Sequence, residues 1–454
     1  MDEFDDVIIG AGQAGPFLAA RLADSGRRVA LVEKRRLGGT CVNDGCIPTK
    51  TLVASARAAY VAREAGRWGV VIGGEVSVDL KKVKARKDAV VQESRDGLQS
   101  WLGGTKNLTL ISGHARFVSP TELEVDGRRL RAQRFFLNTG ARPILPPTPG
   151  LAEVALTNTE MMELDSLPEH LAIIGASFIA LEFAQMYRRF GSRVTVLARG
   201  PRLLPREDED AAEVVAKVFA REGISVRTKT EVASVTKTGA GARLALSSGE
   251  VLEASHVLVA IGRQPNSDQL GLDAAGVSKD AHGNITVDDQ LRTNVPHIYA
   301  LGDVNGRGAF THTSYNDFEV VAANLLDGAS RTIKDRLFIA GVYVDPPLGR
   351  VGMSEREARA SGRPVLKGFR PMTRVGRARE RGETDGFIKV LVDAETKRIV
   401  GASILGIEGD EAIHSIAAVM TAGAPYTVLQ QAVFAHPTVS ELIPTVLGSL
   451  APLT

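Results

Sequence analysis

The chain has 454 residues, which is the length of about three ordinary domains. Its hydrophobic fraction of 44% and charged fraction of 24% are typical of a soluble globular protein. The net charge of +2 argues against nucleic acid or a membrane surface as a partner, and no apolar run is long enough to predict a membrane span.

The N-terminal segment, MDEFDDVIIG, is acidic and leads directly into the apolar pattern of a buried strand. A secretory signal would begin with basic residues and end in a small-residue cleavage site. We therefore expect a cytoplasmic protein, in which lasting structural disulfides are rare.

A dinucleotide-binding unit is predicted directly after this start. A strand is expected at residues 7–9, a helix to about residue 25, and a second strand, VALVE, ending at Glu33. The turn GAGQAG lets the backbone approach a pyrophosphate at the helix N-terminus, and the acid can hydrogen-bond a ribose hydroxyl. The glycines of this motif are Gly10, Gly12 and Gly15.

The only two cysteines, Cys41 and Cys46, lie in the next segment, GGTCVNDGCIPTK at residues 38–50. Inert burial, half of a zinc site and a redox pair are the alternatives. Zinc usually needs four Cys or His ligands at tight spacing, and no His lies near the pair in the sequence. In a cytoplasmic protein a close cysteine pair favours redox or catalytic chemistry over a structural bond.

The spacing of the two thiols predicts the local backbone. Five residues of regular helix rise about 7.5 Å, whereas the Cα atoms of a disulfide lie about 4.4–6.8 Å apart. We therefore expect Cys41 in a turn or a distorted first turn, and a helix starting near Cys46 with Pro48 in its first turn. The turn formers are Asn43, Asp44 and Gly45.

A helix N-terminus lowers the pKa of a thiol and makes it reactive. The pair also follows soon after Glu33, so it can reach along a bound dinucleotide toward a reactive ring. A flavin in that place could pass electrons to the pair.

The nucleotide unit recurs in LAIIGASFIALEFAQMYRRFGSRVTVLAR. Its second strand is predicted to end at Arg199, where the first unit has an acid. Arginine suits a 2′-phosphate, so the second site is predicted to prefer NADP and the first an unphosphorylated ribose. Arg202 and Arg206 lie nearby as further candidates. The motif positions of this unit are Gly175, Ser177 and Ala180.

The remaining segments predict strands and one further domain. Short strands are expected over residues 108–143 and 243–266, and IYALGDV predicts a strand ending in Gly302 and Asp303. The proline-rich PILPPTPG at 143–150 predicts a linker. FIKVLVDAETKRIVGASILG predicts a hairpin, and helices are expected near 411–422 and 426–434.

GGTCVNDGCIPTK strongly resembles the active-site segment of the FAD-dependent pyridine nucleotide–disulfide oxidoreductases, which include glutathione reductase, dihydrolipoamide dehydrogenase and mercuric reductase. Further resemblance covers nearly the whole chain, in the family's order, through GAGQAG, LNTGARP, GASFIALE, AIGRQPN, ALGDV and AHPTVSE. It implies an α/β fold with two Rossmann-like FAD- and NAD(P)-binding domains and a C-terminal α+β dimerisation domain. The domain boundaries we predict are 1–145 and 267–340 for FAD, 146–266 for NADP and 341–454 for dimerisation.

The resemblance implies roles residue by residue. FAD would be bound by Gly10, Gly12, Gly15, Glu33, Gly39, Thr40, Thr139, Gly140 and, at its ribityl chain, Asp303. NADP(H) would be bound by Gly175, Ser177, Ala180, Arg199 and Gly262. Cys46 would be the thiol nearest the flavin, and Cys41 the interchange thiol that meets the substrate.

Two further pairs complete the implied site. Lys50 and Glu182 would lie beside the flavin ring, where a lysine stabilises negative charge and the carboxylate keeps the lysine charged. His436 and Glu441 would form an acid–base pair supplied by the partner subunit of a homodimer. No resident metal is implied.

The electron acceptor is the open question. Arg199 departs from the lipoamide dehydrogenases, and the chain lacks the additional cysteines of mercuric reductases. DPPLGRVGMSEREAR and RVGRARERGETDGFIK resemble the bacterial reactive-chlorine-resistance flavoproteins, which reduce Cu(II) and Hg(II). We therefore expect NADPH to reduce FAD, FAD to reduce the disulfide, and the acceptor to be a soft metal ion. The alternatives are a glutathione-type disulfide, a lipoamide-type substrate, or a flavin-based redox sensor with low turnover.

Overall fold

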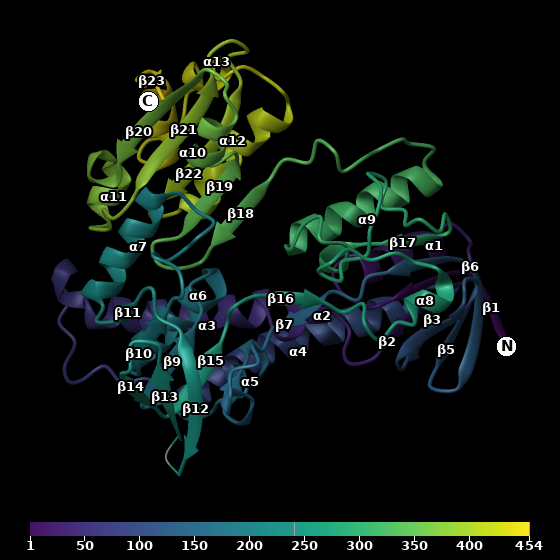
Figure 1. Ribbon diagram of the computed structural model, residues 1–454. Helices are drawn as coiled ribbons and strands as arrows, with labels where there is room; N and C mark the ends of the chain where they lie inside the picture. The colour runs from purple at the N-terminus through teal and green to yellow at the C-terminus, as the bar shows by residue number, and fades with distance from the viewer. Residues whose placement is uncertain (240, 454) are drawn as a thin grey trace.

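In the computed structural model, which describes residues 1–239 and 241–453, the chain is organised around three main sheets. Figure 1 shows the N-terminal sheet at the right, a second sheet at the lower left and the C-terminal sheet at the upper left. The predicted α/β architecture, with two Rossmann-like units and a C-terminal α+β domain, is confirmed. Residue 454, the predicted end of the last domain, lies outside the described residues.

The first sheet has the strand order β3-β2-β1-β6-β5-β4, and β17 pairs with β6. Pairing of β1 with β2 and β6, of β2 with β3 and of β6 with β17 is parallel, whereas β4, β5 and β6 form an antiparallel meander. The strands are β1 (Asp2–Ile9), β2 (Val29–Glu33), β3 (Leu108–Ser112), β4 (Ala115–Ser119), β5 (Glu122–Val125), β6 (Arg128–Leu137) and β17 (Ile298–Ala300).

This sheet is covered on both faces. Phe135 and Phe136 are neighbours on β6, so their rings point to opposite faces, and both are fully buried. Phe135 packs edge-to-face on Phe117, and Phe136 stacks on Tyr299. Helices α1 (Gly15–Asp24) and α9 (Thr311–Leu326) pack over the face that holds Phe136. Burial of each ring contributes about 1.5–3 kcal/mol, which fixes β6 at the centre of the sheet.

The second sheet is parallel, with the order β11-β10-β9-β15-β8. An antiparallel sheet of β12, β13 and β14 packs against it. The strands are β8 (Ala155–Leu156), β9 (His170–Ile174), β10 (Arg193–Leu197), β11 (Ser225–Arg227), β12 (Val232–Thr238), β13 (Gly241–Leu246), β14 (Val251–Ala254) and β15 (His256–Val259). The helices are α5 (Asn158–Met161), α6 (Phe178–Phe190) and α7 (Glu209–Arg221).

The second region is inserted between two parts of the first. The chain enters it through β7 (Ala141–Pro143) and returns through β16 (Arg263–Pro265), and these strands pair with each other. In Figure 1 this ribbon lies between the two sheets. The predicted linker at 143–150 follows β7 directly. Helix α8 (Leu272–Ala275) then packs on β4 in the first region.

Two long helices connect the first region to the second. Helix α3 (Cys46–Arg63) packs against both α4 (Leu80–Gly104) and α6. The N-terminus of α4 is capped by Asp79, whose carboxylate accepts the Lys82 N–H at 3.2 Å. We made no sequence prediction for α4, because its buried residues are few and are separated by many charged ones.

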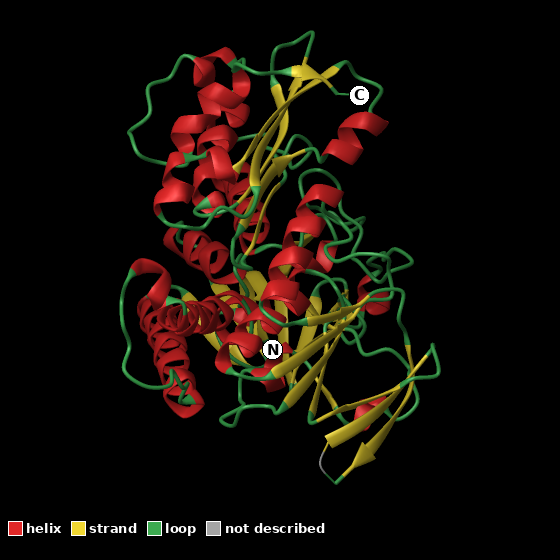
Figure 2. Cartoon of the chain, turned by 90° about the vertical axis from the view of Figure 1, so that its left-hand side faces the viewer, coloured by secondary structure: helices red, strands yellow, loops and turns green. Residues whose placement is uncertain are grey.

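The C-terminal region is an antiparallel sheet with the order β18-β19-β22-β21-β20-β23, and Figure 2 shows helices packed beside it. The strands are β18 (Ile339–Val342), β19 (Leu348–Gly352), β20 (Val365–Pro371), β21 (Phe387–Asp393), β22 (Ile399–Leu405) and β23 (Ala451–Pro452). The helices are α10 (Glu355–Ala360), α11 (Gly376–Glu380), α12 (Gly409–Thr421), α13 (Thr427–Gln430) and α14 (Ile443–Leu447). The predicted hairpin is β21–β22. The helix expected at 426–434 is wrong in length, since α13 ends at Gln430.

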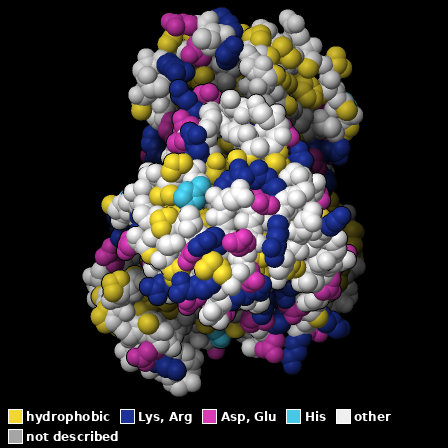
Figure 3. All heavy atoms as spheres, turned by 90° about the vertical axis from the view of Figure 1, so that its right-hand side faces the viewer, with side chains coloured by type: hydrophobic (Ala, Val, Ile, Leu, Met, Phe, Trp, Pro, Cys, Tyr) yellow, Lys and Arg dark blue, Asp and Glu magenta, His cyan; other side chains and the backbone are white. Residues whose placement is uncertain are grey.

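In the part of the chain that the structure describes, no helix is both long and apolar enough to cross a membrane. Figure 3 shows basic and acidic side chains interspersed over the face that it presents.

Candidate active site

The turn between β1 and α1 requires glycine at its key positions. Gly10 has φ +101°, and a Cβ there would lie 2.3 Å from the Asn138 carbonyl oxygen. A Cβ at Gly15 would lie 2.2 Å from the Gly10 oxygen, and one at Gly12 would lie 3.0 Å from Asn138 Oδ1. At the N-terminus of α1, the Gly15 N–H donates to Asn138 Oδ1 at 3.0 Å, and the next residue, Pro16, has no N–H. The positive end of the helix dipole faces this turn and suits a pyrophosphate.

Glu33 ends β2, as predicted. Its carboxylate accepts the Ala11 N–H at 2.8 Å and the Arg35 N–H at 2.7 Å. These two bonds fix the carboxylate beside the glycine turn, which is where a ribose of a dinucleotide would need an acceptor.

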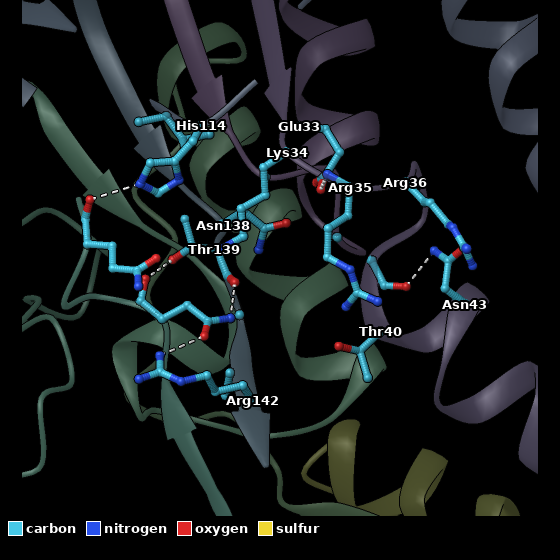
Figure 4. Close-up of a pocket in the computed structure, with 18 of the residues that line it drawn as sticks. Glu33, Lys34, Arg35, Arg36, Thr40, Asn43, His114, Asn138, Thr139 and Arg142 are labelled. Atoms are coloured by element: carbon cyan, nitrogen blue, oxygen red, sulfur yellow. Dashed lines mark hydrogen bonds between the residues drawn. The ribbon is translucent and has the colours of Figure 1, made fainter. Parts of the chain in front are cut away.

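A cavity of about 340 Å³ opens at this edge of the first sheet. Figure 4 shows His114 and Asn43 on opposite sides of it, and Lys34, Arg35 and Arg36 following Glu33 along its wall. Basic side chains beside the helix N-terminus suit the phosphates of a dinucleotide. The predicted residues that line the cavity are Gly10, Gly12, Glu33, Gly39, Thr40, Thr139 and Gly140.

Gly39 and Gly140 shape this cavity through the backbone. Gly39 has φ +56°, and a Cβ on it would lie 2.7 Å from the Cα of Gly12, so the start of the cysteine segment packs directly on the glycine turn. Gly140 has φ +67°. Thr139 beside it donates its hydroxyl to the Asn266 carbonyl at 2.9 Å.

Asn138 was missed by the sequence analysis. It is buried, accepts the Gly15 N–H at 3.0 Å and donates to the Leu301 carbonyl at 3.0 Å. It thus joins β6 to the start of α1 and to the segment that carries Asp303. Its place before Thr139 in LNTGARP was the available signal.

Asp303 lies in a 3₁₀ turn, Gly302–Asn305, and not at a strand end, because β17 stops at Ala300. Gly302 has φ +73°, and its N–H is held by the buried Asp317 carboxylate at 2.7 Å. Burial raises the pKa of Asp303, and the charge of Arg263 opposes that shift. A carboxylate shielded from water is stabilised strongly by hydrogen bonds from hydroxyl groups, and a polyol chain could supply such bonds to Asp303.

Arg263 is a second residue that the sequence analysis missed. It lines the cavity, donates to the Ala141 carbonyl and reaches Thr40 Oγ1 at 3.4 Å. Burial lowers the pKa of its guanidinium, and the nearby charges of Asp303, Asp44 and the Cys46 thiolate oppose that shift. It lies next to Gly262, which has φ +145°.

The cysteines lie on two consecutive helices. Cys41 is in the single-turn helix α2 (Gly39–Asn43), and Cys46 is the first residue of α3. The prediction of a helix start at Cys46 is confirmed, and Cys41, expected in a turn or a distorted first turn, lies in a separate single-turn helix. The turn consists of Asp44 and Gly45, which has no room for a side chain, since a Cβ would lie 2.8 Å from the Thr40 oxygen.

Both cysteines carry free thiols in the described part of the chain, and their pKa values move in opposite directions. The hydrogen bond with Cys41 lowers the pKa of Cys46 to about 6, and the Thr311 hydroxyl and the Lys50 charge act in the same direction, against burial. The same hydrogen bond, together with burial, raises the pKa of Cys41 well above its usual range. Cys46 is therefore the thiolate of the pair.

Thr311 and Lys50 surround Cys46. The Cys46 sulfur lies 3.1 Å from Thr311 Oγ1, at the N-terminus of α9. Lys50 is four residues after Cys46 on α3, which places both on one face of the helix. Its ammonium lies 2.7 Å from Glu182 of α6, so the structure brings together this predicted pair. Thr311 was missed because it is distant in sequence and belongs to no motif that we recognised.

The second nucleotide unit repeats the strand–glycine–helix geometry. Gly175 follows β9 with φ +136°, and a Cβ there would lie 2.3 Å from the Ala260 oxygen. Ser177 precedes α6, and Ala180 is fully buried within it. Strand β10 ends at Leu197, so the prediction that it ends at Arg199 is wrong by two residues.

Arg199 projects from the loop after β10. Its side chain is 86% exposed and its Nε lies 3.8 Å from Glu231 Oε1, so it is open to an incoming anion. Arg202 instead contacts Glu209 at 3.0 Å and the Glu207 carbonyl at 3.1 Å, and Arg206 is exposed.

His436 and Glu441 lie together in the C-terminal region, with His436 Nδ1 2.9 Å from Glu441 Oε2. The imidazole is 79% exposed and the carboxylate 16% exposed. The pair is therefore preformed, and its ring is open at the protein surface. Across residues 1–239 and 241–453, no cluster of three or more His, Cys, Asp or Glu is arranged to hold a metal ion.

Comparison with known proteins gives a consistent result. Residues 4–317 match the family model described as pyridine nucleotide-disulphide oxidoreductase, and residues 339–447 match the dimerisation domain of that description. The chain is 36% identical to the probable pyridine nucleotide-disulfide oxidoreductase RclA of Escherichia coli, over 97% of this chain and 98% of that protein. It is 34% identical to the dihydrolipoyl dehydrogenase of Chlamydia muridarum, over 97% of this chain and 95% of that one.

A solved structure extends this likeness to three dimensions. The Cu(II) complex of the HOCl-induced flavoprotein disulfide reductase RclA from Escherichia coli superposes with a TM-score of 0.91 at 35% identity, covering 99% of each chain.

Proposed function

This chain belongs to the pyridine nucleotide-disulphide oxidoreductase family, and we propose that it is an NADPH-dependent flavoprotein that passes electrons through Cys41 and Cys46 to a soft metal ion. The observation that carries the proposal is the Cys46 thiolate, which is held by Thr311 and Lys50 and lies two residues after Asp44, which lines the dinucleotide cavity.

FAD fits the residues that line this cavity. The N-terminus of α1 suits its pyrophosphate and Glu33 its adenosine ribose, while the half-buried Asp303, which lies outside this lining, suits its ribityl hydroxyls. Gly10 and Gly12 leave the space that a pyrophosphate needs beside the backbone. When bound, FAD supplies a two-electron carrier between a nicotinamide and the cysteine pair.

The cysteines accept two electrons. Breaking the S–S bond of the oxidised pair with two electrons and one proton gives a Cys41 thiol and a Cys46 thiolate. The opposite pKa shifts of the two thiols match this product, because Cys41 keeps its proton while Cys46 loses it. Lys50 places a positive charge on this face of α3, and its ammonium pairs with the Glu182 carboxylate.

NADPH would bind to the second unit. The N-terminus of α6 would face its pyrophosphate beside Gly175, and Arg199 would pair with the 2′-phosphate. The exposure of Arg199 supports this role, since its guanidinium is available at little desolvation cost. The weak contact with Glu231 is the competing interaction.

A homodimer would complete the site. The match to a dimerisation domain supports it, and so does the preformed His436–Glu441 pair, whose ring faces outward. In the dimer, His436 of one chain would exchange a proton with the Cys41 sulfur of the other.

A soft metal ion is the acceptor that we favour. Thiolates are good ligands for soft cations, and the related RclA has been solved as a Cu(II) complex. Two Cu(II) ions, each reduced to Cu(I), or one Hg(II) ion reduced to the metal would take up two electrons. The S–S bond would re-form, and the Cys41 proton would be released.

A low-molecular-weight disulfide is the second candidate, favoured by the His436–Glu441 pair and by the likeness to dihydrolipoyl dehydrogenases. His436 would take the proton of Cys41, the Cys41 thiolate would attack the substrate disulfide, and His436 would return the proton to the departing sulfur. The Cys46 thiolate would then displace the second substrate sulfur from Cys41, so that two electrons pass to the substrate and the Cys41–Cys46 bond re-forms.

Acceptor assays separate these candidates. NADPH consumption is measured anaerobically with Cu(II), Hg(II), oxidised glutathione and lipoamide, with NADH as a parallel donor. Metal-dependent turnover that is lost in Cys46→Ser supports the proposal. Turnover with glutathione or lipoamide and none with metals would refute the metal acceptor, and flavin reduction without turnover on any acceptor would indicate a redox sensor.

A further inference from the structure

Tyr343 contacts both members of the Lys50–Glu182 pair. Its backbone N–H donates to Glu182 Oε1 at 3.0 Å, while Glu182 Oε2 receives the Lys50 ammonium at 2.7 Å. The Lys50 ammonium also lies 4.5 Å from the centre of the Tyr343 ring, within the range of a cation–π interaction. One residue of the C-terminal region therefore holds both the lysine and its carboxylate.

The Tyr343 ring has a defined place directly after β18, which ends at Val342. Gly341 lies beneath it, and a Cβ at that position would come within 3.1 Å of ring atoms of Tyr343. The absence of a side chain at Gly341 therefore lets the ring lie close to the backbone and face Lys50.

Asp345 fixes the backbone two residues after Tyr343. Its N–H donates to Gln185 Oε1 at 2.7 Å, and its carbonyl accepts from Gln185 Nε2 at 2.8 Å. Its carboxylate receives Arg189 at 2.6 Å and Arg57 at 2.5 Å. Glu182, Gln185 and Arg189 recur at helical spacing on one face of α6.

This face of α6 is buried, which makes the register of the segment costly to change. The side chains of Glu182 and Arg189 are 3% and 5% exposed. Arg189 also pairs with Glu222 at 2.7 Å and lies 4.0 Å over the Tyr60 ring. Sliding residues 343–345 along α6 would leave buried charges without partners.

We infer that Tyr343 is a positioning residue that holds the Lys50 ammonium beside Cys46, and that Asp345 fixes Tyr343 in that place. The anchor is the connection between β18 and β19, the first two strands of the C-terminal region. The contact between the C-terminal region and α6 therefore helps to set the position of the Lys50 ammonium beside Cys46.

The groups that act on Cys46 are few enough to be separated by mutation. Cys41 and Thr311 hydrogen-bond to it. Lys50 acts through its charge, and the Arg263 guanidinium interacts with it electrostatically. In the proposed role, Tyr343 makes no hydrogen bond to the Cys46 sulfur. Removing its ring should therefore change only the contribution that passes through Lys50.

The test is a thiolate titration of the reduced holoenzyme, followed by ultraviolet absorbance as the difference from a Cys46→Ser reference. In Tyr343→Leu, Lys50 loses the ring that holds it, and we expect the Cys46 proton affinity to rise about twofold. Tyr343→Phe keeps the ring and should titrate like wild type. Phe369→Leu removes a ring 5.5 Å from Lys367, far along the C-terminal sheet, and should also change nothing.

A double variant shows whether the effect passes through Lys50. In a Lys50→Met background, Tyr343→Leu should leave the titration where Lys50→Met alone places it. An equal shift in both backgrounds, or no shift in Tyr343→Leu, overturns the inference. Asp345→Asn, checked for retained FAD and folded circular dichroism, should reproduce the direction of the Tyr343→Leu shift, and an unchanged titration there removes Asp345 from the scheme.

The inference rests on the proposed function only in taking Cys46 as the working thiolate. The titration needs no electron acceptor and no turnover. If every acceptor fails while the titrations behave as described, the proposed acceptor is wrong and the role of Tyr343 stands. If turnover is as proposed and the titrations do not move, the role of Tyr343 is wrong.

Discussion

Replacing Asn138 by Ala should destabilise the first region more than any surface change on β6, the strand that Asn138 directly follows. Asn138 is 6% exposed, and its amide makes two hydrogen bonds, to the Gly15 N–H and the Leu301 carbonyl. The alanine variant leaves the buried Gly15 N–H without its side-chain acceptor and removes one donor from the Leu301 carbonyl. At about 1–3 kcal/mol for each of these two bonds, the free energy of unfolding should fall by about 2–6 kcal/mol.

Urea unfolding, followed by circular dichroism and by release of flavin fluorescence, measures this loss. With a slope of roughly 3 kcal/mol per M for a domain of this size, the midpoint should fall by about 1 M. Asn138→Asp keeps the acceptor for Gly15 and loses the donor to Leu301, so its midpoint should lie between those of alanine and wild type.

The matched control is Gln133→Ala, on strand β6, which ends one residue before Asn138. Gln133 is exposed, and its amide bonds to Asp5 at 3.0 Å in solvent, so the cost should stay within about 0.5 kcal/mol. Equal midpoints for Asn138→Ala and Gln133→Ala would show that the two buried hydrogen bonds do not support this region.

Three further predictions concern the site. Cys41→Ser and Cys46→Ser should each abolish disulfide reduction while FAD stays bound, and full activity in either would contradict the electron path. Arg199→Glu should lower the ratio of kcat/KM for NADPH to kcat/KM for NADH by about tenfold, since it replaces a charge-assisted bond by repulsion. An unaltered ratio would show that the 2′-phosphate does not bind at Arg199. Because the pKa of Cys46 is lowered to about 6, the thiolate should form as pH rises through 6 and be lost below it, and alkylation by iodoacetamide should follow that profile. A profile centred near 9 would contradict the lowered pKa.

The two nucleotide units were predictable because their chemistry is local. At Gly10 and Gly175 the positive φ and the close approach of a neighbouring carbonyl both demand glycine, so the motif and the geometry coincide. The helix start at Cys46 follows equally from Pro48 and the turn residues before it. Such features depend on a few consecutive residues, which a sequence displays directly.

Features that depend on pairing between distant segments were not predictable. Thr311 meets Cys46 across 265 positions, and Tyr343 meets Glu182 across 161. The end of β10 is set by its register with β11, where Leu197 pairs with Arg227. The sequence pattern placed this strand end two residues too late, at Arg199. The partners of Asn138 likewise become visible only when β6, α1 and the segment before Asp303 are packed together.

The most direct test of the central claim is a count of thiols during anaerobic reduction. The oxidised holoenzyme is titrated with NADPH, quenched in denaturant and reacted with a thiol reagent. We predict two new thiols per chain in wild type, at Cys41 and Cys46, and their loss when Cu(II) or Hg(II) is added afterwards. Complete flavin reduction with no new thiol would contradict an electron path through the cysteine pair.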